Sequence, residues 1–237
     1  MNGMVNIFFI IPAGGIGSRM QADRPKQYLK LLDDQTVLES TLNLFQSLEN
    51  VHSGALGISE NDAYFPALNI PKDQLITYSA GETRSDTVFL GLKALSNIAK
   101  PDDWIIVHDA ARPGLTHEEL ELFITEVMYE EDSIGGIMAM PAVDTVKQVA
   151  HGQITQTIDR ETIYLAQTPQ MFRYQYLYQA YEEALTKKLA ITDEASAIEA
   201  LGYKPYIYQG YPHNFKITHP TDLRLMRFLL EERKLCE

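Results

Sequence analysis

The chain has 237 residues, of which 45% are hydrophobic, and a formal net charge of −12 at pH 7. Its length and apolar content suit one α/β domain with a full core, and its acidity excludes a surface built to coat nucleic acid. A single cysteine, Cys236, excludes a disulfide framework and a thiolate metal site and favours a reducing cytoplasm, and no apolar run approaches the roughly 20 residues of a membrane span.

The first predicted strand, at residues 5–11, runs directly into a glycine-rich loop. The loop reads PAGGIGSRM at 12–20, and PKQYL follows at 25–29. Glycines let backbone N–H groups approach phosphate oxygens closely, and the cations Arg19 and Lys26 can stabilise the charge that develops in phosphoryl transfer. The loop is no P-loop, and Met20 stands where a dinucleotide fingerprint needs a small residue. It predicts a phosphate-binding turn of another type, with a plain strand-to-helix turn as the alternative.

Short apolar strands then alternate with amphipathic helices. Further strands are predicted at 54–58, 75–78, 104–107, 136–140 and 205–208, and apolar residues at helical spacing predict helices around 38–45, 88–95, 116–127, 174–181 and from 220 onward. The alternation predicts a mostly parallel sheet covered on both faces, with ligands beyond the carboxyl ends of its strands.

One segment, at 142–158, breaks the alternation. Residues 144–149 and 154–158 read as two short strands joined around His151 and Gly152, a turn with the glycine that a hairpin favours. The hairpin either extends the parent sheet or projects as an arm. Because two-stranded ribbons are marginal alone, a projecting arm would pack on another subunit.

Three polar residues near predicted strands could carry chemistry. Asp109 follows the strand at 104–107 and can hold Mg²⁺ or a substrate hydroxyl, or can simply pair with Arg112. His108 reads as a packed histidine, since no nucleophile is marked for it to activate. Lys216 reads as a strand-centre lysine that faces away from its two apolar neighbours.

The polar strings of the chain, taken together, resemble one family. The strings in order are PAGGIGSRM at 12–20, PKQYL at 25–29, GETRSDTV at 81–88, HDAARP at 108–113, AVDTVK at 142–147, IDR at 158–160, QTPQMF at 167–172, ITDEASAIEALG at 191–202 and NFKIT at 214–218. Their order is similar to that of the 2-C-methyl-D-erythritol 4-phosphate cytidylyltransferase family, which makes CDP-methylerythritol in the non-mevalonate route to isoprenoids. Gly14 stands where the family more often has Ala, and we do not expect the lost methyl to impair phosphate contact.

The resemblance implies a Rossmann-like nucleotidyltransferase fold in one domain over 1–237, whose β-arm around 141–160 swaps across a homodimer. It implies CTP in the glycine loop, Mg²⁺ on the triphosphate with Asp109 as a further candidate ligand, and 2-C-methyl-D-erythritol 4-phosphate as acceptor. Arg19 and Lys26 match residues that stabilise the transition state, and Arg160 and Lys216 match residues that position the acceptor phosphate. The other matches are nucleotide contacts at Pro12, Ala13, Gly14, Gly15, Gly17, Gly81, Glu82, Arg84, Thr87 and Ala110, and substrate contacts at Asp109, Thr145, Thr168 and Thr192.

Other functions stay open on the sequence. A ribitol-5-phosphate cytidylyltransferase shares the fold and the reaction, but such sequences tend to read HDSVRP where this chain has HDAARP at 108–113, and to lack the continuation Glu194-Ala195-Ser196. A sugar-1-phosphate nucleotidyltransferase is a more distant enzyme alternative. A non-catalytic nucleotide-binding regulator would not need both Arg19 and Lys26.

Overall fold

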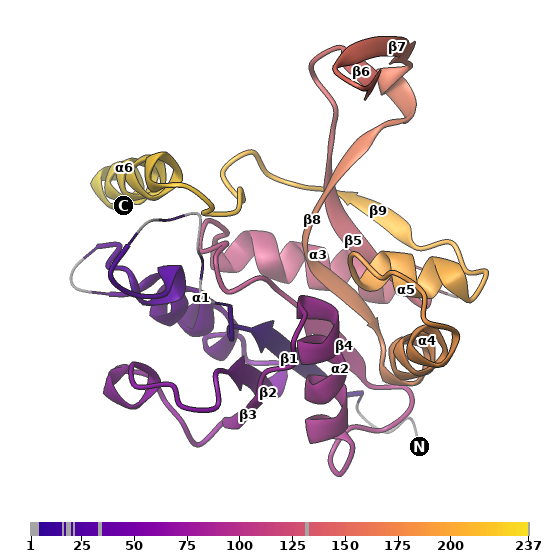
Figure 1. Ribbon diagram of the computed structural model, residues 1–237. Helices are drawn as coiled ribbons and strands as arrows, with labels where there is room; N and C mark the ends of the chain where they lie inside the picture. Colours follow the sequence, from indigo (N-terminus) through magenta and orange to yellow (C-terminus); the bar gives the residue numbers. More distant parts are fainter. Residues whose placement is uncertain are drawn as a thin grey trace.

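The computed structural model describes residues 5–15, 17, 20, 22–32, 35–130 and 133–236. A seven-stranded sheet has the order β3-β2-β1-β4-β8-β5-β9, and β6 pairs with β7 in a separate two-stranded sheet (Figure 1). The strands are β1 (Ile7–Pro12), β2 (Val51–Ile58), β3 (Leu75–Ser79), β4 (Trp104–Val107), β5 (Gly135–Pro141), β6 (Val146–Ala150), β7 (Gln153–Ile158), β8 (Tyr164–Arg173) and β9 (Tyr206–Gln209). The helices are α1 (Val37–Gln46), α2 (Arg84–Leu95), α3 (His117–Tyr129), α4 (Tyr174–Lys187), α5 (Glu194–Ala200) and α6 (Pro220–Cys236), with 3-10 turns η2 (Lys26–Tyr28), η3 (Phe65–Ala67) and η4 (Arg160–Thr162).

The sheet is mostly parallel, as predicted. β3, β2, β1 and β4 run in one direction, and β9 runs parallel to β5. β8 is antiparallel to both of its neighbours, β4 and β5. The sequence did not predict β8, because a proline and three polar residues at 167–170 interrupt its apolar pattern.

Central strand β1 shows why the core has two sides. Ile7, Phe9 and Ile11 pack with residues of α1 and α3 on one face of the sheet. Phe8 and Ile10 pack with residues of α2, α4 and α5 on the other face. A strand buried on both faces is a continuous apolar run, which is the pattern that predicted it. Among the described residues, no helix is long and apolar enough to cross a bilayer.

Side-chain caps fix where the helices begin. A capping box of Thr116 and Glu119 opens α3, and Thr83 and Asp86 form the same box at the start of α2. Each box satisfies backbone N–H groups that a helix start leaves without partners. The start of α2 therefore holds the loop before it, at 80–83, in a defined place beside the end of β3.

The hairpin of β6 and β7 projects away from the main sheet as an arm (Figure 1). Its two-residue turn has positive φ angles at His151 (52°) and Gly152 (79°), as a type I′ turn requires. The arm prediction is confirmed, and the alternative, an extension of the parent sheet, is wrong. On the arm, Val149 and Ile154 are paired across the two strands and are 56% and 66% exposed.

Candidate active site

The glycine loop leaves the carboxyl end of β1 and is held by hydrogen bonds on both sides. The Ala13 N–H donates to the Gly57 carbonyl oxygen (2.7 Å). The buried Gln27 amide donates to the carbonyl oxygens of Ala13 (2.6 Å) and Gly15 (3.1 Å). Gly17 has a φ of 64°, a backbone conformation that residues other than glycine rarely adopt. The hydrogen bonds therefore hold the described start of the loop, at 13–15, in a fixed place.

A second loop, at 80–87, follows β3 and ends in the first turn of α2. The Gly81 N–H donates to the Thr87 hydroxyl (3.1 Å), which in turn donates to the Thr83 carbonyl oxygen (2.9 Å). A Cβ atom at Gly81 would lie 2.4 Å from the Asp86 Cβ, so the tight turn requires glycine. Both loops stand at the carboxyl ends of parallel strands, β1 and β3, which lie on either side of β2, and ligands bind at this edge of such sheets.

Both loops open on one cleft of about 340 Å³. All ten residues predicted to contact the nucleotide line it, together with two of those predicted to contact the acceptor, Asp109 and Lys216. The predicted residues in the lining are Pro12, Ala13, Gly14, Gly15, Gly17, Lys26, Gly81, Glu82, Arg84, Thr87, Asp109, Ala110 and Lys216.

Asp109 is the centre of charge in this cleft. Its Oδ1 accepts a hydrogen bond from Arg84 Nε (2.9 Å), and its Oδ2 lies 3.2 Å from Arg112 Nε and 2.9 Å from Lys216 Nζ. Burial alone would raise the pKa of Asp109, but the three cations outweigh burial and hold the pKa well below its usual range. Asp109 therefore stays ionised and fixes three cations around one carboxylate.

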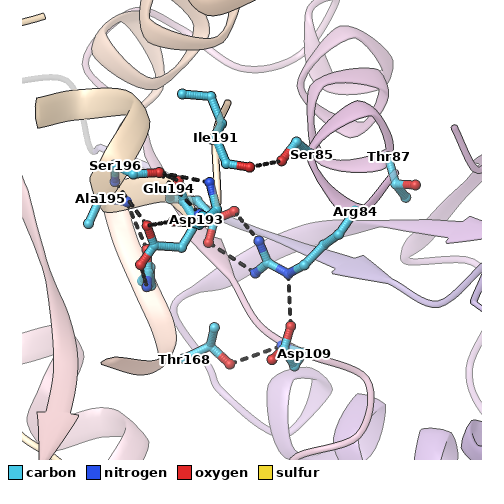
Figure 2. Close-up of polar contacts among 12 residues, drawn as sticks. Arg84, Ser85, Thr87, Asp109, Thr168, Ile191, Asp193, Glu194, Ala195 and Ser196 are labelled. Carbon is cyan, nitrogen blue, oxygen red and sulfur yellow. Dashed lines mark hydrogen bonds and ion pairs between the residues drawn. The ribbon is translucent and has the colours of Figure 1, made fainter. Parts of the chain in front are cut away.

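The far edge of the Arg84 guanidinium is bound by a second buried carboxylate (Figure 2). Glu194, at the start of α5, is fully buried and accepts hydrogen bonds from Arg84 Nη1 (2.8 Å) and Nη2 (3.1 Å). The Tyr181 hydroxyl of α4 donates to the same carboxylate (2.9 Å). Burial acts to lower the pKa of Arg84, but the negative charges of Glu194 and Asp109 raise it overall, so Arg84 is a permanent cation.

The segment 214–218 carries Lys216 into the cleft and accepts a hydrogen bond from Lys26. This segment is irregular, so the prediction of Lys216 as a strand-centre residue is wrong. The Ile217 N–H donates to the Ala111 carbonyl oxygen (2.8 Å), and Lys26 Nζ donates to the Ile217 carbonyl oxygen (2.8 Å). Ile217 is fully buried. The backbone is thereby pinned between the β4–α3 connection and η2, and this places Lys216 beside Asp109.

His108 is a packed histidine, as predicted. Its side chain is fully buried, and burial lowers its pKa to about 4. Nε2 lies 2.9 Å from the Arg112 carbonyl oxygen and must donate, so Nδ1 of the neutral ring accepts from the Thr168 hydroxyl (3.1 Å). The Thr168 oxygen in turn accepts from the Asp109 N–H (3.0 Å). This series of hydrogen bonds orients the backbone of Asp109.

The remaining predicted residues lie elsewhere. Thr145 and Arg160 are exposed on and beside the arm, and Arg160 donates to the Val143 carbonyl oxygen of the arm itself. Thr168 is buried and does not line the cleft, and Thr192 is exposed. Arg19 lies outside the described residues.

Three residues that shape the site were not predicted as site residues. Gln27 stands in PKQYL and Glu194 in ITDEASAIEALG, so both lay inside strings that had been singled out. Tyr181 carried no such signal, because its helical spacing indicated only a packed face. Nothing in the sequence marked Glu194 as buried, because an acidic residue in the first turn of a helix is ordinary.

Comparisons with known proteins agree with this geometry. The sequence profile of the family described as 2-C-methyl-D-erythritol 4-phosphate cytidylyltransferase matches residues 7–232. A protein of that name from Mannheimia succiniciproducens is 46% identical over 231 residues, which are 96% of this chain and 97% of the relative. Another, from Aliivibrio fischeri strain MJ11, is 45% identical over 232 residues, 97% of this chain and 96% of the relative.

Solved structures show the same similarity. The 2-C-methyl-D-erythritol 4-phosphate cytidylyltransferase of Francisella tularensis has a TM-score of 0.82 and 35% identity, with 94% of this chain and 99% of that chain covered. A 4-diphosphocytidyl-2C-methyl-D-erythritol synthase has a TM-score of 0.81 and 36% identity, with 96% and 100% covered. Fold, cleft and similarity over nearly the whole length agree, and the chain therefore belongs to the 2-C-methyl-D-erythritol 4-phosphate cytidylyltransferase family.

Proposed function

We propose that this chain transfers a cytidylyl group from CTP to 2-C-methyl-D-erythritol 4-phosphate, giving 4-diphosphocytidyl-2-C-methyl-D-erythritol and pyrophosphate. The observation that carries the proposal is the convergence of two glycine turns, Lys26, Lys216 and the Arg84–Asp109 pair on one cleft, in a member of this family. The product belongs to the non-mevalonate route to isoprenoids.

The residue types in the cleft suit this reaction. A phosphate oxygen of the acceptor forms a bond to the α-phosphorus of CTP in line, while the bond from that phosphorus to the bridging oxygen breaks and pyrophosphate leaves with the electron pair. The second pKa of a phosphate monoester is about 6, so the nucleophile is already ionised and needs no general base. Two anions must meet, and cations offset both their repulsion and the charge that grows in the transition state.

We propose the role of each residue from its match to the family. Lys26 and Arg19 stabilise the transition state, and Lys216 and Arg160 position the acceptor phosphate. The backbones of the two loops hold the base, ribose and phosphates of CTP. Support comes from the lining of the cleft, which includes both lysines and both loops.

We propose Mg²⁺ as the companion of the triphosphate. Among the described residues, no group of three or more His, Cys, Asp or Glu side chains could hold a metal ion, so a metal would be held chiefly by CTP oxygens. Asp109 fits as a protein ligand only if a carboxylate oxygen gives up one of its cation partners. When bound, Mg²⁺ neutralises charge on the phosphates, and a chelator should abolish turnover.

We further propose a homodimer formed through the arm, in the cytoplasm. Arg160 and Thr145 do not line the cleft of their own chain, so the arm can bring them to the cleft of a second copy. The exposed Val149 and Ile154 offer an apolar surface for that contact. The cytoplasmic location rests on the composition of the chain, which has a single cysteine.

The test is turnover by the purified chain with CTP and Mg²⁺, measured as pyrophosphate release. We expect 2-C-methyl-D-erythritol 4-phosphate to be converted with a higher kcat/KM than ribitol 5-phosphate. An equal or higher kcat/KM for ribitol 5-phosphate would move the assignment to that cytidylyltransferase. CTP binding without any pyrophosphate release would instead indicate a regulator.

A further inference from the structure

The two loops of the cleft meet at a contact that leaves no room for a side chain on Gly14. A Cβ atom at Gly14 would lie 2.2 Å from the Ala80 Cβ, whereas carbon atoms in contact are about 3.5–4.0 Å apart. The next nearest atoms, the Ala80 Cα and the carbonyl carbon of Ile58, would both be 3.7 Å away, an ordinary contact. The conflict therefore involves a single methyl group, that of Ala80.

Neither loop can withdraw without losing a hydrogen bond to the same strand. The Ala13 N–H, next to Gly14, donates to the Gly57 carbonyl oxygen (2.7 Å), and the Ala80 N–H donates to the Ile58 carbonyl oxygen (2.8 Å). Both acceptors belong to the end of β2. A second methyl at this contact would have to displace backbone that lines the cleft.

We propose that residues 14 and 80 form a positioning contact between the two loops. The contact accepts one methyl group, on either residue 80 or residue 14 but not on both, because a second methyl would push the loops apart. Gly14 and Gly81 line the cleft and Ala80 does not, so a change at residue 80 acts on the ligand through its neighbours. The inference rests on the proposed function, because it assigns to this contact the width of the CTP site.

The experiment is a double-mutant cycle on the full chain, read by calorimetric CTP binding and by kcat and KM. Gly14→Ala should weaken CTP binding at least tenfold, and it should raise KM for CTP more than it lowers kcat. Ala80→Gly alone should change CTP binding less than threefold. The swapped variant Gly14→Ala/Ala80→Gly should bind CTP within threefold of the parent, because its methyl then meets only contacts of 3.7 Å. Gly14→Ala/Ala67→Gly is the control, since Ala67 is exposed on η3 and its methyl is far from this contact in the chain; it should bind as weakly as Gly14→Ala.

Parental affinity in Gly14→Ala would overturn the inference, and so would a swapped variant no better than the single one. If Gly14→Ala does not fold, the swapped variant still decides, because it must fold and bind CTP within threefold of the parent. Failure of the proposed function would show in the parental chain, as absence of CTP turnover. The same cycle read by urea unfolding would then still test the contact, with recovery of the midpoint in the swapped variant as the expected result and no recovery as the contrary one.

Discussion

Lys26 and Lys216 lie 190 positions apart in the sequence yet line the same cleft, in a chain whose net charge is −12. Their charges must therefore act locally, on a ligand held within a few ångströms, since solvent and salt screen longer interactions. Lys216 pairs with Asp109, and Lys26 Nζ donates to the Ile217 carbonyl oxygen. The roles proposed above, positioning for Lys216 and charge stabilisation for Lys26, follow the resemblance to the family.

Replacement of a stabilising cation should lower kcat more than it raises KM. For Lys26→Ala, and separately for Arg19→Ala, we expect a fall in kcat of roughly 10²–10³, or about 3–4 kcal/mol, as for the loss of one preorganised donor. Steady-state kinetics with Mg²⁺ and CTP measure it. Lys72→Ala, at an exposed residue outside the cleft, is the control. A near-parental kcat in either variant would remove that residue from the role.

Glu194→Gln should weaken both the fold and CTP binding. The substitution keeps the shape but leaves Arg84 without one of its two carboxylate partners. We expect a loss of about 3 kcal/mol, near the lower end for breaking a buried ion pair, or a fall in Tm of roughly 6–12 °C. KM for CTP should rise about tenfold. Glu199→Gln, exposed on the same helix, is the matched control; equal effects in the two variants would contradict the assignment.

The Asp109 carboxylate should give a stability that acid removes. Its pKa in the folded chain lies below the usual value, which is about 3.9 in an unfolded chain, so its contribution is complete at neutral pH and is lost as the pH falls below about 4. The gap in free energy of unfolding between the parent and Asp109→Asn should be constant from pH 8 to 5 and should shrink by up to about 1.4 kcal/mol per pH unit at lower pH. Urea unfolding at each pH measures it, with the exposed Asp73→Asn as control. A gap that stays constant to pH 3 would show that Asp109 is not stabilised as an anion.

At the scale of elements, the sequence predicted those whose cause is local. β1 and β4 are continuous apolar runs, and the capping box of Thr116 and Glu119 lies within four consecutive residues. β8 could not be predicted in this way, because the polar residues in its centre are buried by partners from other elements. Gln170 illustrates this, since its side-chain amide donates a hydrogen bond to Asp193 and accepts one from the Ala195 N–H, both more than 20 positions away.

The same limit applies to the site. The two glycine loops could be predicted, since their chemistry lies in consecutive residues. The ion pair of Arg84 and Glu194 joins residues 110 positions apart, and no periodicity connects them. The resemblance to the family supplied the residues that spacing could not, and membership in that family is confirmed.

The arm provides a test at the level of one element. If Arg160 acts in the cleft of a second copy, a site combines Lys26 of one chain with Arg160 of the other. Lys26→Ala and Arg160→Ala should each be nearly inactive. When the two are co-expressed, about half of the dimers are mixed and each mixed dimer has one intact site, so about a quarter of the parental activity should return.

Mass-tagged chains show whether mixed dimers have formed. With mixing confirmed, the absence of any recovery would place Arg160 in its own chain. As a further check, Ile154→Asp on the exposed face of the arm should shift the sedimentation of the protein from dimer to monomer, while Glu121→Gln, on the exposed side of α3, should not.

At the scale of the whole molecule, ligand binding and folding are thermodynamically coupled. The cleft gathers residues from η2, α2 and the ends of β1 and β4, which are adjacent only in the folded chain. CTP with Mg²⁺ at about 100 times its Kd should therefore stabilise the fold by about 2.7 kcal/mol and raise Tm by roughly 5–11 °C. Calorimetry at several CTP concentrations measures this. Lys26→Ala should show a smaller shift at the same concentration, and a parental Tm that does not respond to CTP would contradict a CTP site.

The contact between Gly14 and Ala80 also restricts the order in which such a sequence can change. A Cβ added at Gly14 would lie only 2.2 Å from that of Ala80. If residue 14 mutates to alanine first, the intermediate sequence carries both methyl groups and functions poorly. A mutation of residue 80 to glycine that arrives first only opens a small space, and residue 14 can then gain its methyl. The two arrangements are therefore connected by one order of mutations, with residue 80 first, and not by the other, although both arrangements are equally functional.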